Sequence, residues 1–207
     1  MKLYHHPLSS SSRRVALTVA TLGISLEQQL IDLGKAEDRA RLGSLNPNTK
    51  IPVLVDGELV LWESHAIMQY LCGKVPGQTL YPGELRARAE VDRWLFWTAC
   101  HLGPAVGPIN FEKLWKKFVT GGEPDPAMVA RYERFFHQAA TVLDAQLATR
   151  TWLAGETPTL ADFSIASTLM YASRTELPLE PYAHVRAYLA RVHELEAWRA
   201  TDPARVL

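Results

Sequence analysis

The sequence predicts a small α/β domain over residues 1–76, followed by an all-helical domain over residues 85–207. The first domain is predicted because short segments of strand and helix character alternate there. The second is predicted because the later segments are long and repeat their apolar residues with the 3.6-residue period of a helix. A stretch rich in proline and glycine, residues 75–84, separates the two and is typical of a linker.

Composition and charge narrow the class of protein. The 207 residues are 47% apolar and 21% charged, which is ordinary for a chain that buries a core. Basic and acidic residues balance at 22 each without blocks of like charge, so nucleic acid and anionic membrane are not expected partners. No apolar run approaches the ~20 residues that cross a bilayer, and no signal segment opens the chain. Cys72 and Cys100 lack CxxC spacing and are expected to be reduced thiols, so we expect a cytoplasmic protein.

The first domain is predicted to have the order β-α-β-α-β-β-α. Ser12 is a favourable N-cap for the first helix, and Gly23 favours the left-handed conformation that ends a helix. Asp56-Gly57 between two apolar runs indicates a hairpin. We therefore expect two parallel strands joined by a helix, followed by an antiparallel hairpin. The predicted elements are a strand at Lys2–His5, a helix from Ser12 to Gly23, a strand at Leu26–Asp32, a helix at Ala36–Leu42, strands at Val53–Val55 and Leu59–Leu61, and a helix from Ser64 to Gly73.

The second domain is predicted to begin with a long amphipathic helix that bends where Gly-Pro pairs interrupt it. Thr159 and Asp162 form a capping box at the start of a later helix, with Asp in the place of Glu. We expect this pair to be structural, so that loss of Asp162 harms folding before chemistry. The predicted helices are Glu84–Val119 with bends near Gly103-Pro104 and Gly107-Pro108, Ala127–Thr149, Thr159–Arg174, Pro181–His193 and Glu194–Ala200.

Three motifs in the first domain contain candidate residues for ligand binding or catalysis. A cis Ile51–Pro52 bond before a strand would expose the backbone of Ile51 for pairing with a peptide ligand, although an ordinary trans proline also fits a strand edge. Ser64, at a helix start, would bind a carboxylate through free N–H groups while Glu63 pairs with an ammonium, which together suit an α-amino-acid head. A capped helix beside a solvated glutamate is the alternative.

The third motif is a serine-rich turn between the first strand and the first helix, residues 9–12. A hydroxyl in this turn, aided by the helix dipole, can donate a hydrogen bond to a thiolate. A cluster of polar N-cap residues explains the same serines without any chemistry.

At this spacing the three motifs resemble the cytosolic glutathione S-transferases, and the resemblance covers nearly the whole chain. It implies a thioredoxin-like, glutathione-binding first domain and a helical second domain that helps to hold an electrophile. Only serines occupy the catalytic turn, as in the theta, delta and zeta classes. Ser9 is at the serine-class position, with Ser10 and Ser11 as rivals because the loop can slide by a residue. The absence of cysteine in this turn argues against omega-like or beta-like disulfide exchange.

The resemblance also implies the remaining site residues. The expected glutathione contacts are Ser9, Thr49, Lys50, Ile51, Pro52, Glu63, Ser64 and His65. Thr49 replaces the histidine of the delta class, and Lys50 would supply charge to the glycyl carboxylate. The electrophile pocket is expected to include Leu8, His101, Phe111 and Trp115, although core packing explains these aromatic side chains equally well. No metal is expected, because His5 and His6 point to opposite faces of a strand.

The expected function is conjugation of glutathione, a co-substrate, to a small hydrophobic electrophile. A zeta-like isomerase of the maleylacetoacetate type is the enzymatic alternative, although the serine turn matches its pattern only in part. A non-catalytic binding or assembly module is the other alternative, and the retained serines and Glu63-Ser64 pair argue against it. The family resemblance also implies a homodimer.

Overall fold

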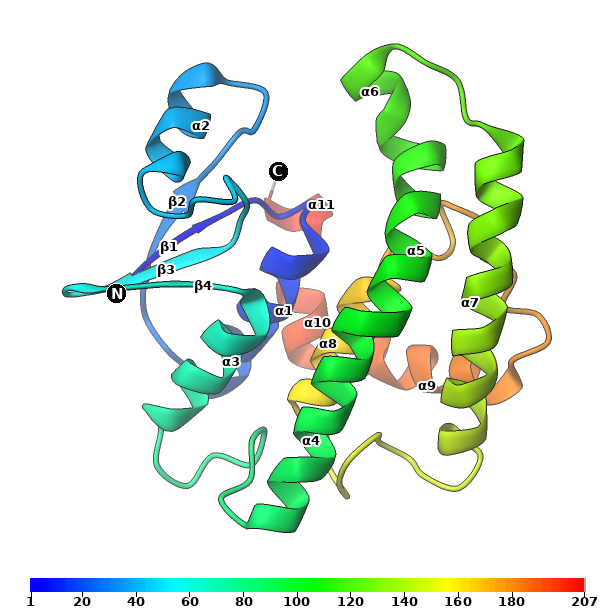
Figure 1. Ribbon diagram of the computed structural model, residues 1–207. Coiled ribbons are helices and arrows are strands. Elements are labelled where there is room, and N and C mark those ends of the chain that lie inside the picture. The colour runs from blue at the N-terminus through cyan, green and yellow to red at the C-terminus, as the bar shows by residue number, and fades with distance from the viewer. Residues whose placement is uncertain (207) are drawn as a thin grey trace. The chain divides into compact units, whose positions relative to one another are not determined.

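The computed structural model describes residues 1–206, with side chains described for residues 1–204 (Figure 1). The chain forms two compact units. The first contains Met1–Pro82 together with the C-terminal residues from Glu194 on, and the second contains Gly83–His193. This differs from the predicted boundary, which placed residues 85–207 wholly in the helical domain. The difference arises because Trp198 packs against Arg13 of the first unit, with the guanidinium 3.7 Å from the ring centroid.

A four-stranded mixed sheet organises the first unit. Its strands lie in the order β2-β1-β3-β4, with β1 parallel to β2 and antiparallel to β3, and β3 antiparallel to β4. This confirms the predicted parallel pair and hairpin. The strands are β1 Lys2–His5, β2 Glu27–Leu30, β3 Val53–Asp56 and β4 Leu59–Trp62.

Helices pack on both faces of this sheet. Successive residues of a strand point to opposite faces of the sheet. The paired residues Leu3 and Leu54 are buried on one face, and Tyr4 and Val53 lie on the other. On the latter face Val53 packs with Ile31 and Leu42, which lies in α2. Figure 1 shows α1 and α3 together on the opposite side of the sheet from α2. The helices are α1 Ser10–Leu22, α2 Ala36–Gly43, α3 Ser64–Gly73, α10 Glu196–Ala200 and α11 Pro203–Val206.

The helix caps correct two predictions. Helix α1 begins earlier than predicted, because Ser9 rather than Ser12 is the N-cap, and Ser9 Oγ accepts a hydrogen bond from the Ser12 N–H at 3.2 Å. Gly23 ends the helix in the left-handed conformation, as predicted. Helix α3 begins at Ser64 as predicted, but the N-cap position belongs to Glu63.

The second unit is helical in its regular structure. The 36 residues that follow Glu84 form a continuous helical segment through α4, α5 and α6, and α7 runs alongside it (Figure 1). Two π-helical turns interrupt this segment: Thr98–Leu102 ends directly before Gly103-Pro104, and Phe111–Trp115 begins three residues after Pro108, which lies inside α5. A widened turn before Pro104 accommodates a residue that lacks an N–H and whose ring crowds the preceding turn. The α-helices are α4 Leu85–Trp97, α5 Gly103–Asn110, α6 Lys116–Thr120, α7 Pro126–Leu147, α8 Leu160–Thr168 and α9 Ala183–Glu194.

The core of this unit gathers around α8, of which every residue is buried. Helix α8 is shorter than predicted, because turns replace its expected last residues, 169–174. The largest fully buried side chains of the second unit are those of Phe136, Phe163 and Tyr188. Within residues 1–206, no helix combines the length and apolar character needed to cross a bilayer.

Candidate functional site

The sheet topology brings the three predicted motifs to one end of the sheet. Strand β1 ends beside the start of β3, since Tyr4 pairs with Val53, and β4 ends there too, since Val53 pairs with Trp62. Pro52 precedes β3, the serine turn follows β1, and Glu63 follows β4. Residues that lie up to 55 positions apart in the sequence, Ser9 to Ser64, therefore lie at one end of the sheet.

The Ile51–Pro52 peptide bond is cis, which is the alternative that exposes the backbone of Ile51. The loop before it is organised by Asn46, which the sequence analysis did not single out and which is 3% exposed. Asn46 Nδ2 donates to the Lys50 carbonyl at 2.7 Å, and Asn46 Oδ1 accepts from the Asn48 N–H at 3.0 Å. The loop ends with Thr49 at φ 50° and an exposed Lys50. The Ile51 side chain packs into the core cluster beneath α2, which fixes the backbone beside Pro52.

The Glu63-Ser64 pair forms a sharp joint between β4 and α3. Glu63 has φ 72°, a left-handed conformation that is uncommon for a residue other than glycine and is often found at functional sites. Ser64 is buried and Glu63 is exposed. The first N–H groups of a helix have no partner within it and lie at the positive end of its dipole. This joint therefore presents an anion-binding helix start beside a carboxylate.

His65, predicted to contact glutathione, turns its ring toward α1. Arg14 Nη1 lies 2.6 Å from His65 Nε2. Burial, together with the Arg14 charge, lowers the pKa of His65 to about 3. Burial lowers the pKa of Arg14 to about 10, while the carboxylate of Glu63 acts in the opposite direction. No local sequence pattern marks Arg14 as a site residue, because its partner lies 51 positions away.

The serine turn distinguishes Ser9 from its neighbours. Ser9 is the N-cap of α1, whereas Ser10 and Ser11 lie in the first turn of the helix. All three are half-buried. Ser12 is buried and accepts a hydrogen bond from the His6 N–H at 3.4 Å. Since Ser9 Oγ uses a lone pair for Ser12, its own proton is available for donation at the positive end of α1.

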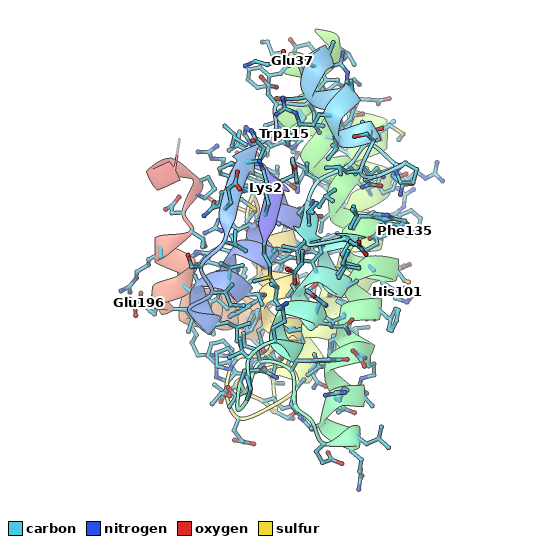
Figure 2. All side chains as sticks on the ribbon, turned by 90° about the vertical axis from the view of Figure 1, so that its left-hand side faces the viewer. Lys2, Glu37, His101, Trp115, Phe135 and Glu196 are labelled. Atoms are coloured by element: carbon cyan, nitrogen blue, oxygen red, sulfur yellow. The ribbon has the colours of Figure 1, made fainter. Side chains whose placement is uncertain are left out.

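The residues predicted to hold an electrophile lie in both units. Leu8 is half-buried in the turn after β1. His101 lines a cavity of about 460 Å³ in the second unit, together with Trp97, Cys100, Tyr132 and Phe135. Phe111 and Trp115 do not line this cavity, and Trp115 instead meets Tyr171 edge-on, with ring centroids 5.5 Å apart. Figure 2 shows His101 and Phe135 on the same side of this unit and Trp115 away from them.

The capping box predicted at α8 is confirmed. Asp162 Oδ2 accepts hydrogen bonds from the Thr159 N–H at 2.8 Å and from Thr159 Oγ1 at 3.0 Å. Asp162 Oδ1 accepts from the Leu153 N–H at 3.0 Å. The carboxylate is completely buried, and burial raises the pKa of Asp162 to about 6 although these donors act in the opposite direction.

No metal site is evident among the side chains of residues 1–204, since they contain no group of three or more His, Cys, Asp or Glu residues that could hold an ion. The two adjacent histidines have local roles. His5 is buried, which lowers its pKa, and His6 Nδ1 accepts a hydrogen bond from the Leu8 N–H at 3.2 Å.

Comparison with known proteins identifies the family. The family models of the glutathione S-transferase N-terminal and C-terminal domains match residues 1–72 and 128–191. A probable glutathione S-transferase from Oryza sativa subsp. japonica is 33% identical over 191 residues, covering 91% of this chain and 89% of that protein. A maleylpyruvate isomerase from Ralstonia sp is 30% identical over 209 residues, covering 99% of this chain and 97% of that protein. The structure of a glutathione S-transferase-I bound with lactoylglutathione has a TM-score of 0.86 at 27% identity and covers 97% of both chains. These matches, together with the motifs at one end of the sheet, show that the chain belongs to the glutathione S-transferase family.

Proposed function

We propose that this protein binds glutathione at the end of the sheet and conjugates it to a small hydrophobic electrophile. The observation that carries the proposal is the meeting of the cis-proline, the Glu63-Ser64 joint and the serine turn at that end. The cysteinyl backbone pairs with Ile51, the γ-glutamyl head binds at Glu63-Ser64 with His65 beside it, and the thiol faces Ser9. Thr49 and Lys50 meet the glycyl end.

The chemistry needed is activation of a thiol rather than ionisation of serine. A free thiol has a pKa of ~8.5, and each unit by which that pKa falls favours the thiolate by ~1.4 kcal/mol. The Ser9 hydroxyl donates a hydrogen bond to the sulfur, and the start of α1 adds its positive potential. The thiol proton passes to solvent, and the thiolate attacks the electrophile, so that a carbon–sulfur bond forms and a leaving group departs with its electron pair.

We propose that residues of both units contact the electrophile. Leu8, next to Ser9 in the serine turn, would provide an apolar contact near the sulfur. From the second unit we propose His101, which lines a cavity with Phe135, whereas Phe111 and Trp115 do not line that cavity and their proposed role rests on the family resemblance. Fold alone does not determine which electrophile is accepted, since second-domain pockets vary within a fold.

Substitution of the serines tests the catalytic assignment. Ser9→Ala should lower turnover of an aryl halide, while glutathione affinity measured by isothermal titration calorimetry changes little. Ser10→Ala and Ser11→Ala are matched controls from the same turn and should retain turnover. Unchanged turnover in Ser9→Ala, with loss in either control, would move the role to the neighbouring serine.

Glutathione-dependent isomerisation is a second candidate, favoured by the relative named maleylpyruvate isomerase. In that reaction glutathione is added and then returned, so the same thiolate site would serve. Assays of maleylpyruvate and maleylacetoacetate isomerisation against aryl halide conjugation separate the two activities. Faster isomerisation than conjugation at equal substrate concentration would favour the isomerase.

We also propose that the protein is a homodimer. Exposed apolar side chains of the second unit support this, since Phe96 of α4 is 70% exposed and Phe135 and Val142 of α7 are 44% and 49% exposed. Exposed apolar side chains that lie together are typical of association surfaces, and Phe135 and Val142 line one cavity with Trp97, the residue after Phe96. Sedimentation velocity of the purified chain should give a mass near twice 23.2 kDa.

A further inference from the structure

The contact between Arg14 and His65 joins the two helices that carry opposite ends of the proposed site. Helix α1 begins at the N-cap Ser9, and α3 begins at Ser64. Arg14 lies five residues after Ser9, which corresponds to about 7.5 Å along a helix that rises ~1.5 Å per residue. Its guanidinium reaches His65, the residue after Ser64. This contact therefore adds to the packing of α1 against α3 in holding Ser9 and Ser64 at a fixed separation.

The chemistry of this contact fixes the state of both side chains. A guanidinium has N–H donors and no acceptor, so Arg14 must donate and His65 Nε2 must accept. His65 is therefore neutral, with its proton on Nδ1. Protonation of Nε2 would remove the acceptor and place two cations 2.6 Å apart.

Arg14 also places a buried positive charge behind the start of α3. Its side chain is 7% exposed, so solvent screens this charge less than it would at the surface. The Glu63 carboxylate lies near enough to oppose the lowering of the Arg14 pKa that burial causes. The charge and the helix dipole act in the same direction on an anion bound at Ser64.

We propose that Arg14 is a positioning residue that, through His65, makes the site selective for thiols carrying a γ-glutamyl group. This inference rests on the proposed function. The γ-glutamyl arm separates the thiol of glutathione from its α-carboxylate. The Arg14–His65 contact fixes the separation between the serine turn and the start of α3, and the buried charge favours the carboxylate at that end.

Two selectivity ratios of kcat/KM test this role, measured with an aryl halide as electrophile. The first compares glutathione with cysteinylglycine, which lacks the γ-glutamyl group. The second compares glutathione with γ-glutamylcysteine, which lacks the glycyl group and serves as the control at the other end. In Arg14→Met we expect the first ratio to fall at least tenfold, mainly through a higher KM for glutathione, while the second ratio stays unchanged.

The chain offers a matched control for removal of a buried arginine. Arg13, at the neighbouring position of α1, is 6% exposed, but it donates to the Trp198 carbonyl at 3.2 Å and stacks on the Trp198 ring. Arg13→Met should lower the midpoint of thermal unfolding and leave both ratios unchanged. An equal fall of the first ratio in Arg13→Met and Arg14→Met would overturn the inference, because general loosening of α1 would then explain both.

Substitutions of His65 keep the test independent of whether Arg14→Met folds. His65→Leu removes the acceptor of the Arg14 N–H groups and should lower the first ratio at least tenfold, whereas His65→Gln, which retains an acceptor, should lower it less. If wild-type protein binds glutathione in isothermal titration calorimetry and His65→Leu keeps the first ratio, the inference is wrong while the proposed function stands. If the wild-type protein binds no glutathione, the proposed function itself is wrong.

Discussion

Replacement of Asp162 by alanine should destabilise the helical unit more than the loss of an ordinary helix cap. In the wild type the completely buried Asp162 carboxylate accepts hydrogen bonds from the Thr159 and Leu153 N–H groups, and the substitution removes both acceptor oxygens. Loss of an N-cap costs about 1 kcal/mol, and a buried N–H left without an acceptor costs about 1–3 kcal/mol. We therefore expect a loss of about 3 kcal/mol. For a chain of this size that corresponds to a fall in Tm of about 6–12 °C.

Differential scanning calorimetry at pH 7 measures this effect, with Asp125→Ala as the matched control. Asp125 caps α7, where its Oδ1 accepts from the Ala127 and Met128 N–H groups, but the side chain is only partly buried. Water replaces its hydrogen bonds after substitution, so we expect a cost of about 1 kcal/mol and a fall in Tm of about 2–4 °C. A fall in Asp162→Ala no larger than in the control would refute the argument that burial makes this capping box important.

Further measurements test other features of the structure. The folded-state pKa of Asp162, about 6, lies above its ordinary value of 3.8. Wild type should therefore exceed Asp162→Asn in unfolding free energy by the largest amount below pH 3.8. This difference should decrease by about 3 kcal/mol as the pH rises to 6 and stay level above pH 6. Urea titrations over this pH range measure the difference, and an increase with pH would contradict the expectation. Gly103→Ala should lower the free energy of unfolding by about 1–3 kcal/mol, because the new Cβ would lie 3.0 Å from the Thr98 carbonyl oxygen. Gly107→Ala, whose new Cβ would have no such atom within 4 Å, should be neutral or stabilising. Chemical denaturation measures both effects. Glu63→Gly should relieve the strain at φ 72° by about 1 kcal/mol while weakening glutathione binding, and a parallel loss of stability in calorimetry would contradict that expectation.

Local signals were sufficient for most of the first unit. The strand predicted at Lys2–His5 matches β1, and Asp56-Gly57 located the hairpin between β3 and β4. The N-cap of α1 was wrong, because each residue from Ser9 to Ser12 is a suitable cap and local preference does not separate them. The contact of Ser12 Oγ with the His6 N–H, which depends on how β1 meets α1, favours the observed register.

Long-range contacts explain what the sequence did not reveal. Two π-helical turns, which the sequence did not predict, lie near the Gly-Pro pairs, and their formation depends on packing around the whole helix. The C-terminal residues join the first unit through Trp198 and Arg13, which lie 185 positions apart. Arg14 and His65 likewise show no periodicity or motif that would predict their contact.

The proposed site occupies backbone positions that are costly by themselves, and buried polar side chains hold them in place. Glu63 and Thr49 both have positive φ, a conformation that costs a residue with a Cβ about 1–2 kcal/mol. Asn46 holds the loop that ends in Thr49 through hydrogen bonds to Asn48 and Lys50. Arg14 holds the turn that follows Glu63 through His65. A glycine would satisfy the backbone at either position without strain, so the retention of side chains there is better explained by ligand contacts than by folding.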